Sequence, residues 1–423
     1  MNFLNAVSLL ETGHPWSLWV SPSLLNLSYP IVLPAWGGEQ GNAMYAFYAY
    51  LSLPFLKIFG YSLGVFRLPM LSLSLLGAGS VASIAWLWKG KRLALIVGAL
   101  LAVSPYMILM SRYALESLAY GNLLFMALAL FLFGVRYRKL IVCYGAMCLF
   151  GVSMYAYGLS LISAPFIVLA CLFLGKRQWK FPHLAGMAAA YGLVALPFFL
   201  YILINFYSLP TIETGFFSIP SLGGNRSNEF IFMRPEPLWF KWNAVKYYLK
   251  LFIGMALQYP QEQEAFMEWG TFYRYTVLFF LLGLVILIKR TMAKHKTSSS
   301  LPIGALILLV IAIYAALGAM IHPGNARINP GWYAYGLTSA LGLWVLRQKM
   351  PWLFLASMIC YAISLTSFAR AFFTGDHCLM RQYGDDVGLQ YYQNPEDFHP
   401  RGAQRAIKEA FDLIESRGNR SQY

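Results

Sequence analysis

The stretch KGKRLALIVGALLAVSPYMILMSRYALESLAYGNLLFMALALFLFGVRYRK, from Lys89 to Lys139, decides the fold class. It holds two apolar runs, each close to the ~20 residues that a helix needs to cross a bilayer. Basic clusters stand at its outer ends, and a polar junction with Arg112 and Glu116 separates the runs. This pattern predicts two membrane-spanning helices whose connection lies on one side of the membrane, with the basic loops on the other.

The whole chain shares this character. Its 423 residues are 59% hydrophobic and 12% charged, with a mean hydropathy of +0.56, whereas soluble domains are about 25% charged. The net charge is +15, and basic cytoplasmic loops explain such an excess in a membrane protein. We therefore expect no nucleic-acid partner.

The charges also indicate how the chain crosses the membrane. All 17 acidic residues lie outside five basic loops, which are 89–92, 136–139, 176–180, 289–296 and 347–349. Since basic loops face the cytoplasm, both termini should be extracytoplasmic. We expect an all-α polytopic membrane protein with about ten transmembrane helices, at 69–88, 93–110, 118–135, 140–154, 158–175, 184–205, 273–288, 301–321, 330–346 and 350–368.

Three regions follow from these spans. Residues 1–68 form an extracytoplasmic loop with an interfacial helix at 45–60, and we expect a further span ahead of them to carry them across the membrane. Residues 69–368 form the transmembrane part, and its long outer loop at 206–272 contains an aromatic and basic stretch typical of a helix at the lipid headgroups. Residues 369–423 form an outer tail with a small amphipathic helix at 403–414.

Charged residues at the outer junctions are the candidates for function, because the spans contain almost none. Three of them suit an anionic lipid headgroup, since a guanidinium binds phosphate in a bidentate manner: Arg67 in GVFRLP, Arg112 in MSRYALE and Arg327 in IHPGNARIN. His322, in the same motif as Arg327, is a candidate hydrogen-bond donor to the phosphate. Two carboxylates accompany them: Glu116, which would share a helix face with Arg112 four residues earlier, and Glu39 in WGGEQGN. The alternative for Arg112 and Glu116 is a helix-end charge pair without a binding role.

The order of several motifs resembles the GT-C membrane glycosyltransferases, in particular the bacterial branch similar to protein O-mannosyltransferases and lipid A aminoarabinose transferases (family 39-type). The resemblance covers nearly the whole chain. The motifs that carry it are NAVSLLETG (Asn5–Gly13), LSLPFLKIFGYSLGVFRLP (Leu51–Pro69), SPYMILMSRYALE (Ser104–Glu116), GVSMYAYGLSLISAP (Gly151–Pro165) and NARIN (Asn325–Asn329).

This resemblance implies a transferase of the bacterial cell membrane. It would move a sugar from a polyprenyl-phosphate donor to a lipid, glycan or protein hydroxyl at the outer face, with membrane lipids around it. A carboxylate would take the hydroxyl proton, and Arg67, Arg112, Arg327 and His322 would hold the donor phosphate.

The catalytic carboxylate is the point at which this chain departs from the family. The family places an Asp-Glu pair directly after its first span, and here the match begins at about Asn5, so the resemblance implies that this span and this Asp are missing from the sequence. Either the start is truncated or wrongly assigned, or the protein is a degenerate relative. This puts the activity of the chain in question. Glu116 and Glu39 are the remaining candidates for the catalytic carboxylate.

No metal or nucleotide motif accompanies these residues. The sequence has no Gly-rich phosphate loop, no HExxH and no cysteine cluster, so no metal ligands are predicted and a divalent cation is the single cofactor left open.

Two other functions stay open. A transporter or flippase of lipid-linked glycans would also have many spans, although such proteins usually place charged or broken helices near the bilayer midplane. An inactive GT-C-like subunit would explain the missing Asp.

Overall fold

The chain is described here from a computed structural model. The described residues are 6, 10, 35–37, 43–45, 47–112, 116–176, 178–213, 218–221, 230–259, 269–293 and 302–374. Glu39 and the predicted tail helix at 403–414 lie outside them.

The chain forms two compact units. Unit 1 comprises Met1–Pro69, Leu200–Asn225 and Ala369–Tyr423, and unit 2 comprises Met70–Phe199 and Arg226–Phe368.

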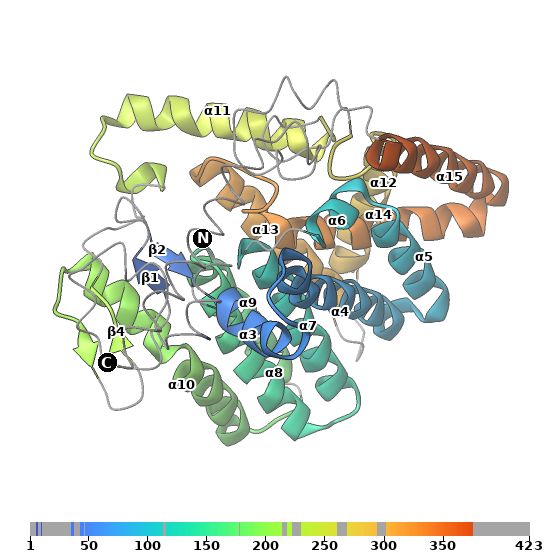
Figure 1. Cartoon of the computed structure of the whole chain (residues 1–423). Coiled ribbons are helices and arrows are strands. Elements are labelled where there is room, and N and C mark those ends of the chain that lie inside the picture. The colour runs from blue at the N-terminus through green and yellow to red at the C-terminus, as the bar shows by residue number, and fades with distance from the viewer. Residues whose placement is uncertain are drawn as a thin grey trace. The chain divides into compact units, whose positions relative to one another are not determined.

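Helices dominate the described residues (Figure 1), as expected for an all-α polytopic membrane protein. They are α3 (Phe47–Phe59), α4 (Leu63–Lys89), α5 (Lys91–Ala102), α6 (Pro105–Met110), α7 (Glu116–Arg136), α8 (Leu140–Ser153), α9 (Ser160–Gly175), α10 (Phe181–Phe206), α11 (Leu238–Ala256), α12 (Thr276–Ala293), α13 (Ile303–Met320), α14 (Asn329–Lys349) and α15 (Pro351–Thr374), with short 3-10 turns η3 (Met154–Ala156) and η5 (Ile231–Met233).

Each of the ten predicted spans is occupied by helix. Within the described ranges, five helices are long and apolar enough to cross a membrane by length and composition: Gly64–Lys89, Glu116–Arg136, Phe181–Phe206, Ile303–Met320 and Pro351–Phe372. Three shorter apolar helices accompany them, at Phe47–Phe59, Leu140–Ala156 and Ser160–Gly175.

The span predicted at 93–110 is not one continuous helix. α5 ends at Ala102, and α6 begins at Pro105 with Ser104 as its N-cap. Pro105 lacks the backbone N–H that would continue the hydrogen bonding of α5, so that helix ends before it. The Ser104 hydroxyl then starts α6 by accepting a hydrogen bond from the Met107 N–H at 3.4 Å. Such a break is tolerated at membrane depth where the freed groups find partners inside the protein.

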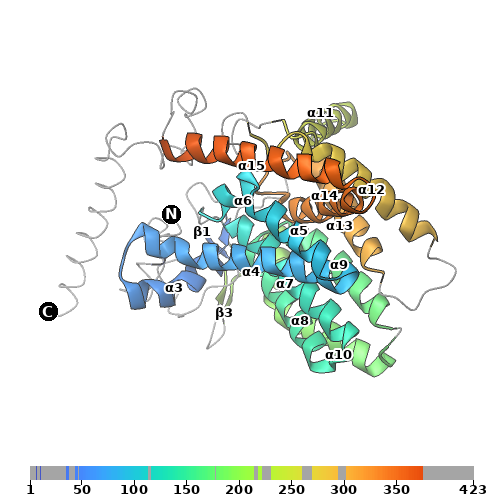
Figure 2. The same cartoon turned by 90° about the vertical axis from the view of Figure 1, so that its right-hand side faces the viewer.

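Helix α14 is the centre of unit 2. It packs against α5, α7, α12 and α13, and α7 packs against α8 on the other side of the unit (Figure 2). Nearly every residue from Asn329 to Leu343 is buried. Small residues let the backbones meet: a Cβ added to Gly283 of α12 would collide with the Thr338 carbonyl, and one added to Gly342 would collide with the Phe279 carbonyl. This glycine pair explains the close contact of α12 and α14, as in other membrane helix pairs.

Helix α11 lies along one side of unit 2 and contacts α13 (Figure 1). Its aromatic and aliphatic side chains remain exposed, with Leu238 at 77%, Trp239 at 67% and Trp242 at 57%. The predicted helix is confirmed, and its place at the lipid headgroups stays a prediction.

Unit 1 contains α3 and two short hairpins. The antiparallel pair β1 (Ala35–Gly37) and β2 (Ala43–Tyr45) and the pair β3 (Ile212–Glu213) and β4 (Ser218–Ile219) are the strands of the described residues. The buried Tyr48 hydroxyl of α3 donates to the Phe66 carbonyl at 2.6 Å, and the two rings meet edge to face. This contact fixes α3 against the start of α4, next to Arg67.

Candidate functional site

The predicted outer junctions of unit 2 are joined by a buried hydrogen-bond network. The Ser104 hydroxyl donates to the Thr271 carbonyl at 2.7 Å, and the Tyr106 N–H donates to the same oxygen at 3.3 Å. The Tyr106 hydroxyl donates to the Asn325 carbonyl at 2.8 Å, and the Thr271 hydroxyl donates to Asn325 Oδ1 at 3.2 Å. We call Ser104, Tyr106, Thr271 and Asn325 the polar clamp.

The polar clamp connects three segments that are far apart in the sequence. All four residues are 1–2% exposed, so their polar groups depend on one another rather than on water. The clamp joins helix α6, the segment 269–275 and the loop 321–328. It therefore holds the beginning of α6, where Tyr106 stands six residues before Arg112, in a fixed relation to the loop that carries His322 and Arg327.

A second network joins the starts of α7 and α14. The Asn329 amide donates to the Leu118 carbonyl at 3.2 Å, and the Asn122 amide donates to the same carbonyl at 3.1 Å. The Tyr333 hydroxyl donates to Asn122 Oδ1. Glu116 is two residues before Leu118, and Arg327 is two residues before Asn329. The structure thus brings the chain segments of these two predicted site residues together.

His322 and Arg327 occupy one loop. Arg327 is half-buried, and its Nη1 donates to the His322 carbonyl at 3.5 Å. The Tyr248 ring of α11 meets the imidazole edge to face at 5.5 Å. Burial, and then the charge of Arg327, lower the pKa of His322, so its imidazole is neutral at pH 7. His322 can therefore donate one hydrogen bond here, but the positive charge of the loop comes from Arg327.

Arg112 and Glu116 do not share a helix face as the four-residue spacing predicts. Helix α6 ends at Met110, Arg112 lies in a turn, and α7 begins at Glu116. The Arg112 side chain is exposed, and Glu116 is half-buried in the first turn of α7. The positive end of the helix dipole stabilises the carboxylate there. Both residues remain at the same junction, at one end of unit 2.

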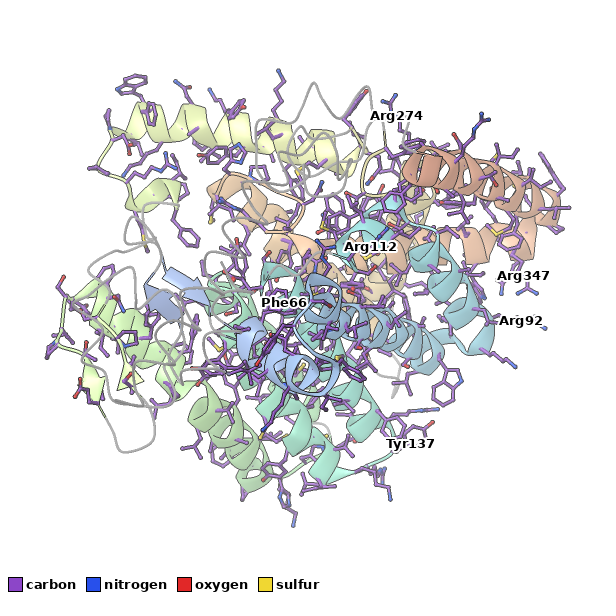
Figure 3. All side chains as sticks on the ribbon, viewed as in Figure 1. Phe66, Arg92, Arg112, Tyr137, Arg274 and Arg347 are labelled. Atoms are coloured by element: carbon purple, nitrogen blue, oxygen red, sulfur yellow. The ribbon has the colours of Figure 1, made fainter. Side chains whose placement is uncertain are left out.

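The basic loop after α7 marks the other end. Because α7 has 21 residues, its two ends are about 31 Å apart, close to the ~30 Å of a bilayer core. Figure 3 shows Arg112 well separated from Tyr137, which follows α7.

Two predicted site residues, Arg67 and Glu39, belong to unit 1. Arg67 is half-buried on α4, whereas the remaining ones belong to unit 2. Glu39 lies outside the described residues, so its role stays a prediction.

Sequence reasoning missed Arg274. Its guanidinium lies 5.6 Å from the Tyr259 ring centroid, and it follows Thr271 of the polar clamp by three residues (Figure 3). The sequence analysis placed this arginine inside a predicted span at 273–288, whereas α12 begins only at Thr276 and leaves Arg274 before the helix. An arginine between two tyrosines at the start of a span was the available signal.

The described residues contain no group of three His, Cys, Asp or Glu side chains that could hold a metal ion.

No protein-family model and no curated protein matches the sequence. Among solved structures, the chain is similar to ArnT from Cupriavidus metallidurans bound to undecaprenyl phosphate, with 18% identity and a TM-score of 0.51 over 80% of this chain and 57% of that one. The apo state of the same protein gives 19% identity and a TM-score of 0.49 over 86% and 66%. The apo oligosaccharyltransferase of Archaeoglobus fulgidus has 15% sequence identity and a TM-score of 0.48, over 92% of this chain and 52% of that one.

The likeness to ArnT in its undecaprenyl phosphate complex shows the fold. The chain is a polytopic helical membrane protein whose fold is similar to that of this ArnT structure. It spans 57% of the length of that ArnT chain.

Proposed function

We propose that the chain is a membrane glycosyltransferase that moves a sugar from a polyprenyl-phosphate donor to a hydroxyl of a lipid, glycan or protein at the outer membrane face. The observation that carries this proposal is the polar clamp, which joins the segments bearing Arg112, Arg274, His322 and Arg327. The hydrogen bond from Asn329 to the Leu118 carbonyl ties the last of these segments to the first turns of α7, which begins with Glu116. The fold supports it, since the ArnT structure of similar fold holds undecaprenyl phosphate.

The arginines suit the phosphate of the donor. A guanidinium presents a planar fork of N–H donors that matches two phosphate oxygens, and it stays charged at every relevant pH. In the proposed reaction the acceptor oxygen forms a bond to the anomeric carbon, while the bond from that carbon to the phosphate oxygen breaks. Arg327 and Arg112 would stabilise the negative charge that develops on the departing lipid phosphate.

Glu116 is the proposed acceptor-side carboxylate of unit 2. It would accept the proton of the attacking hydroxyl, which balances the charge that leaves with the phosphate. It stands in the first turn of α7, where the positive end of the helix dipole stabilises a carboxylate. Glu39 is the second candidate for this role, and the two are distinguished by experiment.

The test uses the full chain in liposomes with a radiolabelled polyprenyl-phosphate sugar and a mixture of acceptors, with and without EDTA. Arg327→Ala and Arg112→Ala should each weaken donor binding about ten- to a hundredfold, because a lost charged hydrogen bond costs about 1.5–3 kcal/mol. Lysine at either position should restore only part of it. Arg136→Ala, an exposed arginine at the other end of α7, is the matched control and should bind normally.

Carboxylate variants test the chemistry. If Glu116 is the base, Glu116→Gln should lower the transfer rate about 10²–10⁴-fold while donor binding persists. An unchanged transfer rate in both Glu116→Gln and Glu39→Gln would exclude both residues as the general base. Movement of intact donor lipid across the vesicle without transfer would establish the transporter instead, and donor binding with neither outcome would establish an inactive subunit.

A further inference from the structure

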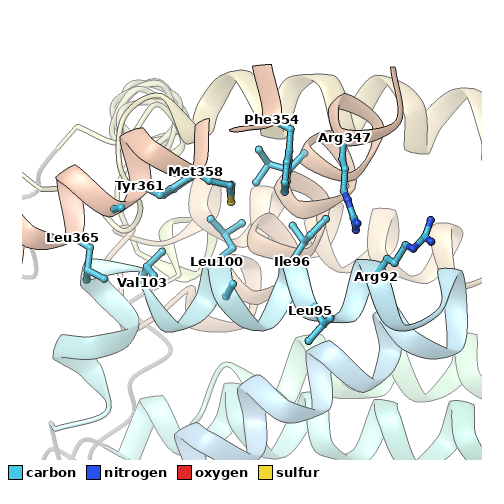
Figure 4. A pocket seen from close by; sticks show the side chains of 13 residues that line it. Arg92, Leu95, Ile96, Leu100, Val103, Arg347, Phe354, Met358, Tyr361 and Leu365 are labelled. Carbon is cyan, nitrogen blue, oxygen red and sulfur yellow. The ribbon is translucent and has the colours of Figure 1, made fainter. Parts of the chain in front are cut away.

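A second feature of unit 2 extends along α5, from its first turn to Val103, next to Ser104 of the polar clamp. A groove of about 420 Å³ runs between α5, α14 and α15. Figure 4 shows its side chains: Arg92 and Arg347 lie at one end, and Val103 and Leu365 lie at the other. The walls between these ends are almost entirely apolar, and no acidic residue lines the groove.

The sequence explains the shape of the groove. On α5, Ile96, Leu100 and Val103 follow Arg92 at helical spacing and form one stripe. Phe354, Met358, Tyr361 and Leu365 form the matching stripe on α15. Each stripe covers eleven residue steps, or about 16 Å of helix, which is close to the ~15 Å of hydrocarbon in one leaflet. The groove is therefore as long as one layer of lipid chains.

Exposed apolar side chains surround the groove. Leu95, on its rim, is 63% exposed, and neighbouring side chains on α15 are also exposed, with Leu355 at 61% and Ile363 at 64%. Exposed apolar side chains around an apolar groove fit a lipid chain.

The charged end lacks a protein counter-ion. Both Arg92 and Arg347 are exposed, and neither forms a hydrogen bond or ion pair with another described residue. Helix α5 begins there at Lys91 with Gly90 as its N-cap, so no side chain caps its first N–H groups. Arg290 of α12 lies near the same end of α14, where its guanidinium is 5.7 Å from the Trp344 ring centroid. Its Nη1 is buried without a hydrogen-bond partner among the described residues.

We propose that this groove binds one anionic phospholipid of the surrounding membrane, with an acyl chain between α5 and α15 and its phosphate on Arg92 and Arg347. The charge pattern favours this occupant, because two unpaired guanidinium groups at the end of an apolar groove complement a headgroup with net negative charge. An apolar partner helix would leave both charges without a counter-ion. The phosphate end of the groove lies at the beginning of α5, whereas the polar clamp lies beyond the end of that helix, so the two proposed phosphate sites are distinct.

The experiment titrates the detergent-purified full chain with dioleoyl phosphatidylglycerol or dioleoyl phosphatidylcholine and follows bound lipid by native mass spectrometry. Phosphatidylglycerol should bind at least about tenfold more tightly, because only it has a net negative charge. The double variant Arg92→Ala/Arg347→Ala should reduce its binding to the phosphatidylcholine level. The control Arg136→Ala/Lys139→Ala removes the same charge from the loop after α7 and should leave binding unchanged.

A further variant tests the groove itself. Ala362 lines the groove and is exposed, so Ala362→Phe should fill the groove without disturbing the core, and binding should fall at unchanged charge. Equal binding of the two phospholipids would overturn the proposal. So would an equal loss in the control, which would indicate general attraction to a basic surface. Competition by glycerol phosphate as effective as that by the whole lipid would show that the groove takes no part.

Discussion

Removal of a single hydroxyl from the polar clamp should loosen the loop that carries His322 and Arg327. Tyr106→Phe keeps the ring and loses the 2.8 Å hydrogen bond to the Asn325 carbonyl. Both residues are 2% exposed, so water cannot replace the lost partner. A buried carbonyl left without its partner costs about 1–3 kcal/mol. The loop should therefore open more often while the helices stay folded.

Hydrogen exchange measures this effect directly. If opening of the loop becomes easier by about 1–3 kcal/mol, its protected amides should exchange about 5- to 150-fold faster. The Ile328 N–H, which donates to the Gly324 carbonyl at 3.1 Å, is a suitable reporter. Amides in the middle of α7 should be unaffected, because they lie outside the clamp.

The control is Tyr137→Phe. Tyr137 is 45% exposed and follows α7 at the other end of unit 2, so the same chemical change should alter stability by less than about 0.5 kcal/mol. Thr271→Val removes the 3.2 Å hydrogen bond from the Thr271 hydroxyl to Asn325. If the clamp acts as one unit, the increase in exchange rate in the double variant should be smaller than the two single effects combined. Unchanged exchange across 321–328 in Tyr106→Phe would refute the clamp as a positioning device.

Three further predictions concern packing, pH and topology. Gly283→Leu should disrupt the contact of α12 with α14 and lower the melting temperature sharply, whereas Gly98→Ala, which has open space around it, should leave the melting temperature equal or higher. Since the pKa of His322 is lowered in the folded chain, its contribution to stability is complete above pH ~6.5 and is lost as the pH falls below it. The drop in melting temperature from pH 7.5 to 5 should be smaller in His322→Gln, and an equal drop would contradict the assignment. Cysteines at Ser298 and Gln348 should be shielded from an impermeant thiol reagent in intact cells while a cysteine at Ser227 reacts; the reverse pattern would invert the topology.

The helices could largely be predicted from the sequence because the bilayer leaves the chain few choices. A long apolar run must be helical to satisfy its own backbone, so the predicted 140–154 corresponds to α8 (Leu140–Ser153) and the predicted 158–175 to α9 (Ser160–Gly175). Rare charges at the junctions likewise made Arg112, Glu116 and Arg327 candidate site residues, and their roles stay a prediction. These are local signals, which a single sequence contains in full.

What the sequence could not determine depends on contacts between distant residues. The Ser104 hydroxyl meets the Thr271 carbonyl across 167 positions, and the Tyr106 hydroxyl meets the Asn325 carbonyl across 219. Serine, threonine, asparagine and tyrosine are common and uncharged, so no pattern in the sequence distinguishes these four from the others. The break after Ala102 follows from Pro105, but the partner of the freed Tyr106 N–H is the Thr271 carbonyl, far along the chain. Membrane physics thus specified the helices one by one, and only tertiary packing decided which polar groups meet between them, because a hydrogen bond across the fold leaves no local signal in either partner's sequence.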